Sequence, residues 1–174
     1  MTTMQTWSEA ARSGVTSGLL ASALSSAALA ARGRVEADSA VAPTNATSHW
    51  VWGERAALQD EPSVKYTVVG YLIHQAAGLL WATVYERVAS DREGQRGAGR
   101  AVVAGVAVAA LAATVDYTMT PRRLMPGYEK RLSVGSLVAV YGAFAVGLAL
   151  RDVLTSRRDD AHPADEVDPN RLRY

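Results

Sequence analysis

Five ionisable side chains stand within or next to apolar stretches of this 174-residue chain: His49, Glu54, His74, Asp116 and Glu129. Imidazole and carboxylate groups can transfer protons in catalysis, and both are suitable metal ligands. No two of the five stand at a diagnostic metal-site spacing such as H-E-x-x-H, so the sequence predicts no metal site. No G-x-S-x-G, C-x-x-C or G-K-[ST] motif occurs. The sequence therefore predicts no cofactor and leaves open whether the protein is an enzyme.

His74 is expected near the middle of a membrane, because it stands about nine residues, or about 13 Å of helix, inside its apolar stretch. An ionisable group at that depth has a functional interpretation, as a base or as part of a polar transport path. The structural interpretation is a neutral imidazole that forms a hydrogen bond to Ser22 or Ser25. We favour the structural interpretation, because such bonds commonly join membrane helices.

Asp116 is expected closer to the membrane surface, about 10 Å in depth from His74, so that the two act as separate groups. The favoured interpretation is an ion pair with Arg122 or Arg123 of the following loop, since ion pairs near the headgroups are common. The alternative is a functional one. It places the Asp116 carboxylate in one polar pocket with three other candidates: His49, Glu54 and Glu129.

Four basic residues, Arg122, Arg123, Lys130 and Arg131, flank the last apolar stretch. Basic side chains at the ends of membrane helices often bind lipid phosphates, and this is the functional interpretation. Ordinary flanking charge is the alternative. Because the net charge is only +1 and no block of like charges occurs, the sequence predicts no nucleic-acid partner.

The elements that must position these residues are four apolar stretches with few or no charged side chains. Each is close to the roughly 20 residues that a transmembrane helix needs. The sequence therefore predicts an all-α fold, a four-helix transmembrane bundle within residues 1–150, followed by a charged, disordered tail at 151–174. The expected spans are 14–31, 66–85, 101–117 and 132–150.

Small residues fall on one face of each expected span, which is typical of helices that approach each other closely in membranes. In the last span this face contains Gly135, Ala139 and Gly142, whereas Phe144 and Leu148 are expected to face lipid. Tyr141 lies among the bulky residues and is not expected in a site. In the first three spans the small-residue faces include Gly14, Gly18, Ala21, Ser22 and Ser25, then Gly70, His74 and Gly78, then Gly105, Ala109, Ala112 and Asp116.

The long segment 32–64 is expected to contain a short interfacial helix that starts at Thr44 or Asn45 and runs to about Leu58. Four spans place this loop on the same side of the membrane as the 117–131 loop. The basic residues divide evenly between the two sides, so the positive-inside rule does not orient the chain. The alternative for residues 14–31, a cleaved signal sequence, would leave three spans.

Three motifs, G-Y-L-I-H-Q at 70–75, W-x3-Y-E at 81–86 and D-Y-x-x-T-P-R-R-L-x-P-G-Y-E-K-R-L-S at 116–133, resemble those of the uncharacterised small four-span inner-membrane proteins of bacteria. The resemblance implies a multi-pass protein of the bacterial inner membrane and no particular activity. We expect a non-catalytic bundle with membrane lipids as partners, or with another membrane protein or a second copy bound through small-residue faces. The alternative is a membrane enzyme or small transporter that uses a polar pocket between the 32–64 and 117–131 loops.

Overall fold

The computed structural model describes residues 6–89 and 97–161, with side chains up to Arg157. Throughout these ranges the regular structure is helical. Four helices there are long and apolar enough to cross a membrane, which identifies a multi-pass membrane protein and confirms the predicted all-α bundle. They are α1 (Trp7–Glu36), α4 (Val69–Ala89) extended by the π-helical turn η2 (Val64–Val68), α5 (Ala98–Thr114) extended by the π-helical turn η3 (Val115–Met119), and α6 (Val134–Ala161).

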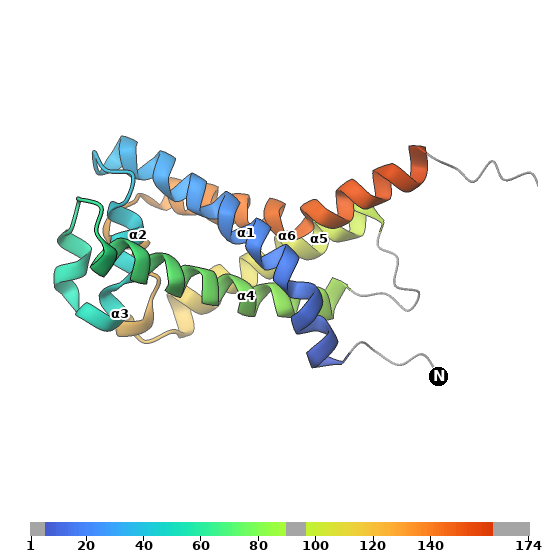
Figure 1. The fold of residues 1–174 in the computed structure, drawn as a ribbon, viewed down its shortest axis with the longest axis horizontal. Coiled ribbons are helices and arrows are strands. Elements are labelled where there is room, and N and C mark those ends of the chain that lie inside the picture. Colours follow the sequence, from blue (N-terminus) through green and yellow to red (C-terminus); the bar gives the residue numbers. More distant parts are fainter. Residues whose placement is uncertain (1–5, 90–96, 162–174) are drawn as a thin grey trace, which may run out of the picture.

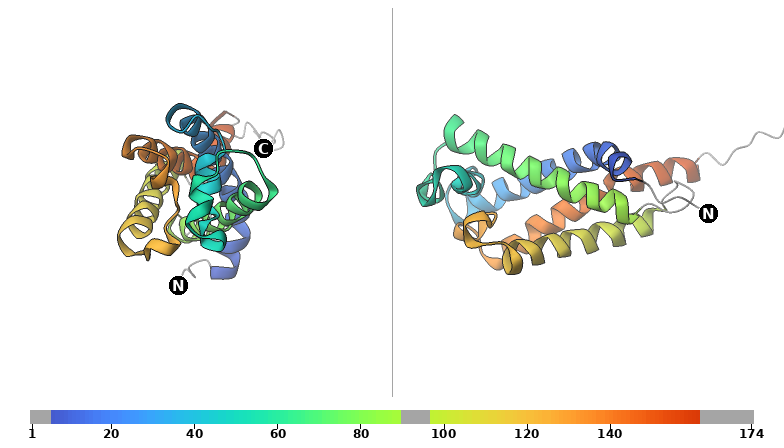
Figure 2. Two further views of the ribbon diagram at one scale, coloured as in Figure 1. Left: turned by 90° about the vertical axis from the view of Figure 1, so that its left-hand side faces the viewer. Right: turned by 90° about the horizontal axis from the view of Figure 1, so that it is seen from below.

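The four long helices run along one axis, and the two long loops gather at one end of the bundle (Figures 1 and 2). Helix α1 packs against both α4 and α6, and α5 packs mainly against α6. The first described turn of α1 and the last turn of α6 lie at the opposite end (Figure 1). The two loops therefore share one side, as the four-span topology predicts, and the bundle holds them face to face.

Two helices are longer than the sequence suggested. Helix α1 starts at the Thr6–Glu9 capping box and continues to Glu36, so Arg32 and Arg34 belong to the helix and not to the loop. Helix α6 continues to Ala161, so residues 151–161 are helical where disorder was predicted, and Arg151 and Asp152 are bonded to partners on α4. Residues 162–174 lie outside the described part of the chain.

The predicted packing faces are correct in α1, α4 and α5, where the small residues named above are buried, apart from the half-buried Asp116. In α6 the prediction is reversed. Gly135 and Gly142 are exposed, whereas Phe144 and Leu148 are buried. The close approach of α6 is made instead by Gly147, where an added Cβ would lie 2.4 Å from the backbone of Ala21 in α1. The buried bulky side chains of α6 then fill the space left by small residues of the neighbouring helices.

The end of the bundle that carries the loops is closed by short helices, which we call the loop layer: α2 (Ala42–Thr47), α3 (His49–Trp52), η1 (Glu54–Leu58), η4 (Arg122–Leu124) and η5 (Tyr128–Lys130). The expected single helix to Leu58 begins earlier, because Pro43 stands in the first turn of α2, and it breaks at Gly53, whose φ is +68°. Helix α2 is buried, whereas Val51, Trp52 and Leu58 are exposed.

Candidate functional site

The candidate residues line two separate pockets among the described residues. One is a small cavity inside the bundle, lined by His74 and Asp116. The other is a cleft in the loop layer, lined by His49, Glu54 and Glu129. Asp116 lines the interior cavity, whereas the three loop residues line the cleft, so the expected joint pocket is not one continuous cavity.

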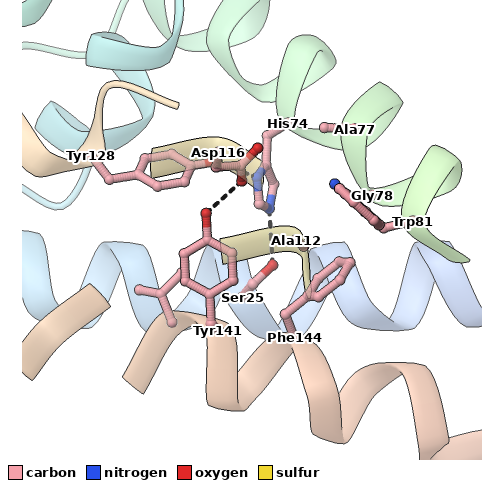
Figure 3. A pocket seen from close by; sticks show the side chains of 11 residues that line it. Ser25, His74, Ala77, Gly78, Trp81, Ala112, Asp116, Tyr128, Tyr141 and Phe144 are labelled. Atoms are coloured by element: carbon pink, nitrogen blue, oxygen red, sulfur yellow. Dashed lines mark hydrogen bonds between the residues drawn. The ribbon is translucent and has the colours of Figure 1, made fainter. Parts of the chain in front are cut away.

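His74 is bonded at both ring nitrogens, and every proton in its network has an acceptor. The Ser25 hydroxyl donates to the carbonyl oxygen of Ala21 at 2.8 Å, so His74 Nε2 donates to Ser25 Oγ at 2.9 Å (Figure 3). His74 Nδ1 then accepts from the Tyr128 hydroxyl at 2.6 Å. Burial raises the pKa of Tyr128 above its usual value, which keeps this hydroxyl protonated. The predicted bond from His74 to Ser25 is present, and the structure adds a second partner from the loop layer.

Asp116 lies in η3 and accepts a hydrogen bond of 2.6 Å from the Tyr141 hydroxyl of α6 (Figure 3). The predicted ion pair with Arg122 or Arg123 is not formed, because η3 directs the carboxylate toward α6 and away from the loop. Tyr141, which the sequence placed against lipid, is thus a site residue. The ring of Tyr117 packs edge-on against it, with 6.1 Å between centroids.

The interior cavity has a volume of about 40 Å³, and aromatic rings form much of its wall. Since a bound water needs about 10–15 Å³ of such volume, the cavity can hold a few waters at most. His74 and Asp116 both line it but bond to different partners, as separate groups. The lining residues are Ser25, His74, Ala77, Gly78, Trp81, Ala112, Asp116, Tyr128, Val140, Tyr141 and Phe144 (Figure 3).

The cleft in the loop layer forms where the two loops meet, and we call it the loop cleft. The Trp50 indole donates to the carbonyl oxygen of Met125 at 2.8 Å, which joins α3 to the turn before η5. Gly127, with φ +90°, lies so close to α2 that an added Cβ would be 2.7 Å from the carbonyl oxygen of Ala46. The resulting cleft has a volume of about 690 Å³ and is lined by His49, Gly53, Glu54, Arg122, Arg123, Met125, Glu129 and Lys130.

The four basic residues at this end divide into two pairs. Lys130 bonds to Glu54 at 2.6 Å, and this hydrogen bond lowers the pKa of the Glu54 carboxyl. Arg131 pairs with Asp60 and donates to the carbonyl oxygen of Ala57 at 3.1 Å. These two cations hold the loops together. In contrast, Arg122 and Arg123 are exposed at the cleft, and neither forms an ion pair within the described chain.

His49 is 2% exposed, and its Nδ1 donates to the carbonyl oxygen of Ala46 at 2.8 Å. Its Nε2 atom and the Oε2 atom of Glu129 are buried without a hydrogen-bond partner in the described structure. Two residues that line the cleft thus each have a buried polar atom that no described residue satisfies. Within residues 6–89 and 97–161, no three His, Asp or Glu side chains lie close enough together to hold a metal ion.

The opposite half of the bundle contains an ion cluster that sequence reasoning missed. Arg151 of α6 donates to both carboxylate oxygens of the fully buried Glu86 of α4, at 3.1 and 3.3 Å. Tyr85 donates to Asp152 at 2.8 Å, and Ser17 of α1 donates to Glu86. The sequence did carry a signal for this cluster: at 100° per residue, Arg151 falls on the same face of its helix as Phe144. The cluster therefore joins α1, α4 and α6 to one another.

Comparison with protein-family models, curated proteins and solved structures finds no match for this chain.

Proposed function

We propose that this protein is a non-catalytic, lipid-binding bundle of the bacterial inner membrane, and that its loop cleft binds the phosphate of a lipid headgroup. One observation supports the proposal above the others: Arg122 and Arg123 line the cleft together, and neither forms an ion pair with a described residue. The resemblance of segments 70–75, 81–86 and 116–133 to small proteins of the bacterial inner membrane supports this location.

Guanidinium groups suit a phosphate because their planar, forked donors can bind two oxygens at once. The contrast with Lys130 and Arg131 matters, since those cations are already engaged by Glu54 and Asp60. Two adjacent arginines that form no ion pair repel each other, and a bound phosphate would offset this repulsion.

The cleft also lies at a suitable depth for a headgroup. It is at the end of the four spans, where three apolar side chains of neighbouring segments are exposed: Trp52, Met119 and Leu124 are 42%, 73% and 44% exposed. Aromatic and apolar side chains at this level typically lie at the boundary between headgroups and acyl chains. A lipid whose phosphate reached the arginines would extend its chains along this apolar rim.

The test is a titration of the detergent-purified protein with phosphatidylglycerol, followed by native mass spectrometry. We expect the double variant Arg122→Gln/Arg123→Gln to lose at least tenfold in lipid affinity. The matched control, Arg34→Gln/Arg55→Gln, removes two exposed charges at the same end but outside the cleft, and should bind as the wild type does. Equal losses in the two double variants would reduce the proposal to non-specific charge attraction.

The alternative partner is a second membrane protein or a second copy of the chain. One observation favours it, namely that Gly135, Ala139 and Gly142 of α6 form an exposed small-residue face. Such a face permits close helix contact. Substitution of Gly142 by Leu would then change the oligomeric state in detergent without changing lipid affinity.

A further inference from the structure

Two residues that line the loop cleft each carry a buried polar atom without a hydrogen-bond partner among the described residues: His49 Nε2 and Glu129 Oε2. A buried polar atom without a partner is destabilising, and more so when it is charged, so native proteins rarely leave one unsatisfied. Two such atoms in one cleft indicate that a ligand supplies the missing donors.

The hydrogen bond of His49 to the backbone shows which of its ring nitrogens carries a proton. Its Nδ1 lies 2.8 Å from the carbonyl oxygen of Ala46, and a carbonyl oxygen can only accept, so Nδ1 carries the proton. In the neutral imidazole, Nε2 then has a lone pair and needs a donor. Gly127 lies close to the same ring, since a Cβ added to Gly127 would be 3.0 Å from Nδ1 of His49.

Glu129 adds a negative charge to the same cleft. The acidic neighbour Glu54 is engaged by Lys130, whereas Glu129 forms no ion pair with any described residue. A carboxylate with a buried, unpartnered oxygen favours a cationic donor over a neutral one. A primary ammonium supplies three N–H donors and a positive charge, so it can satisfy both Glu129 and His49.

We propose that the loop cleft is a site for the phosphoethanolamine headgroup of a membrane lipid. The phosphodiester oxygens bind Arg122 and Arg123, and the primary ammonium donates to Glu129 and His49. This assignment rests on the proposed function, which supplies the phosphate half of the site. A volume of about 690 Å³ is within the usual range for small-molecule sites and is ample for this headgroup. A choline headgroup carries the same charges but has no N–H, and it leaves both acceptors unsatisfied.

The experiment compares three lipids with identical acyl chains: phosphatidylethanolamine, phosphatidylcholine and phosphatidylglycerol. Each is titrated into the full chain in detergent, and binding is measured by native mass spectrometry. We expect the wild type to bind phosphatidylethanolamine at least tenfold more tightly than phosphatidylcholine. Glu129→Gln and His49→Phe should each abolish most of this preference and leave phosphatidylglycerol affinity within about twofold. Glu61→Gln, which removes an exposed acidic charge at the same end, should leave the preference unchanged.

The outcomes separate the two proposals. If the wild type binds phosphatidylglycerol through the arginines but does not distinguish ethanolamine from choline, the phosphate site stands and the ammonium assignment is overturned. If Arg122→Gln/Arg123→Gln binds all three lipids as tightly as the wild type, both are overturned. Should His49→Phe fail to fold, Glu129→Gln decides the question alone.

One further arm distinguishes a lipid from a free headgroup. Soluble glycerophosphoethanolamine is added as a competitor to the lipid-bound protein. We expect no displacement at concentrations tenfold above that of the lipid, because the acyl chains contribute to binding along the apolar rim. Full displacement at that ratio would show that the ligand is a soluble phosphoethanolamine compound and would overturn the assignment to a lipid.

Discussion

The Tyr128 hydroxyl, carried by the loop between α5 and α6, donates a 2.6 Å hydrogen bond to Nδ1 of His74 in the second span. The loop layer is thereby joined to the bundle interior by a contact between residues 54 positions apart. Both side chains are almost fully buried, at 5% and 8% exposure. The position of the loop cleft therefore depends on a polar contact inside the membrane-spanning part of the protein.

Tyr128→Phe should lower the stability of the protein in detergent by about 1 kcal/mol, because it removes the donor to a buried imidazole nitrogen. Thermal unfolding of the purified protein measures the effect. Tyr71→Phe is the matched control, since Tyr71 is 39% exposed on the same helix as His74, and its hydroxyl has no hydrogen-bond partner among the described residues. A Tyr128→Phe variant as stable as Tyr71→Phe would contradict the assigned bond.

His74→Leu should cost a similar amount, about 1 kcal/mol, because His74 acts through its bonds to Ser25 and Tyr128. In a double-mutant cycle with Tyr128→Phe, the combined loss should be smaller than the sum of the two single losses by several tenths of a kcal/mol or more. Loss of lipid binding by His74→Leu with unchanged thermal stability would instead assign a functional role to His74.

Tyr141→Phe should destabilise the protein more than Asp116→Asn does. The first variant removes the 2.6 Å donor and leaves a carboxylate without it in an apolar cavity, at a cost of about 1–3 kcal/mol. In the second variant an amide oxygen still accepts from Tyr141. Thermal unfolding of both variants gives the comparison. A larger loss in Asp116→Asn, or a loss of lipid binding there, would point to a charge-dependent role for Asp116.

Arg151→Ala should destabilise the bundle by about 2 kcal/mol. Breaking a fully buried ion pair costs about 3–5 kcal/mol, and the figure is smaller here because the Arg151 side chain is 31% exposed. Arg157→Ala, at an exposed position further along α6, should change stability by less than about 0.5 kcal/mol. Similar unfolding temperatures for the two variants would rule out a stabilising ion cluster.

Cysteines introduced at Trp52 and Met125 should react with an impermeant thiol reagent from the same side of the membrane, because the two loops are joined by the Trp50–Met125 bond. A cysteine at Arg157 should react only from the other side. The chain has no native cysteine, so each label reports a single position. Labelling of Trp52 and Met125 from different sides would mean that one span is missing.

The sequence was sufficient to locate the spans because membrane helices require long stretches with few charges, and these are visible without any tertiary information. It also gave the correct packing faces of α1, α4 and α5. In α6, periodicity defined two faces but could not tell which one was inward. That choice depended on Gly147, whose contact with Ala21 exists only in the packed bundle.

The candidate site was predicted only in part, because some of its contacts also exist only in the folded chain. Residue types singled out His49, Glu129 and the two arginines, and the bond from His74 to Ser25 followed from helix depth. Tyr128 was not predicted, because its role comes from a loop that folds back onto the bundle, and loop conformation is not encoded in hydrophobic periodicity. The separation of paired from unpaired cations likewise depends on which loop residues meet in space.

Binding of a phospholipid in the loop cleft can be measured in the native membrane. A benzophenone amino acid placed at Met125, which lines the cleft, captures on illumination whatever occupies that position. We predict a phospholipid adduct in the mass spectrum of the purified protein, and its loss when Arg122 and Arg123 are replaced by Gln. A protein adduct in place of the lipid, or a lipid adduct that persists unchanged without the two arginines, would show that the cleft does not bind a phospholipid through Arg122 and Arg123.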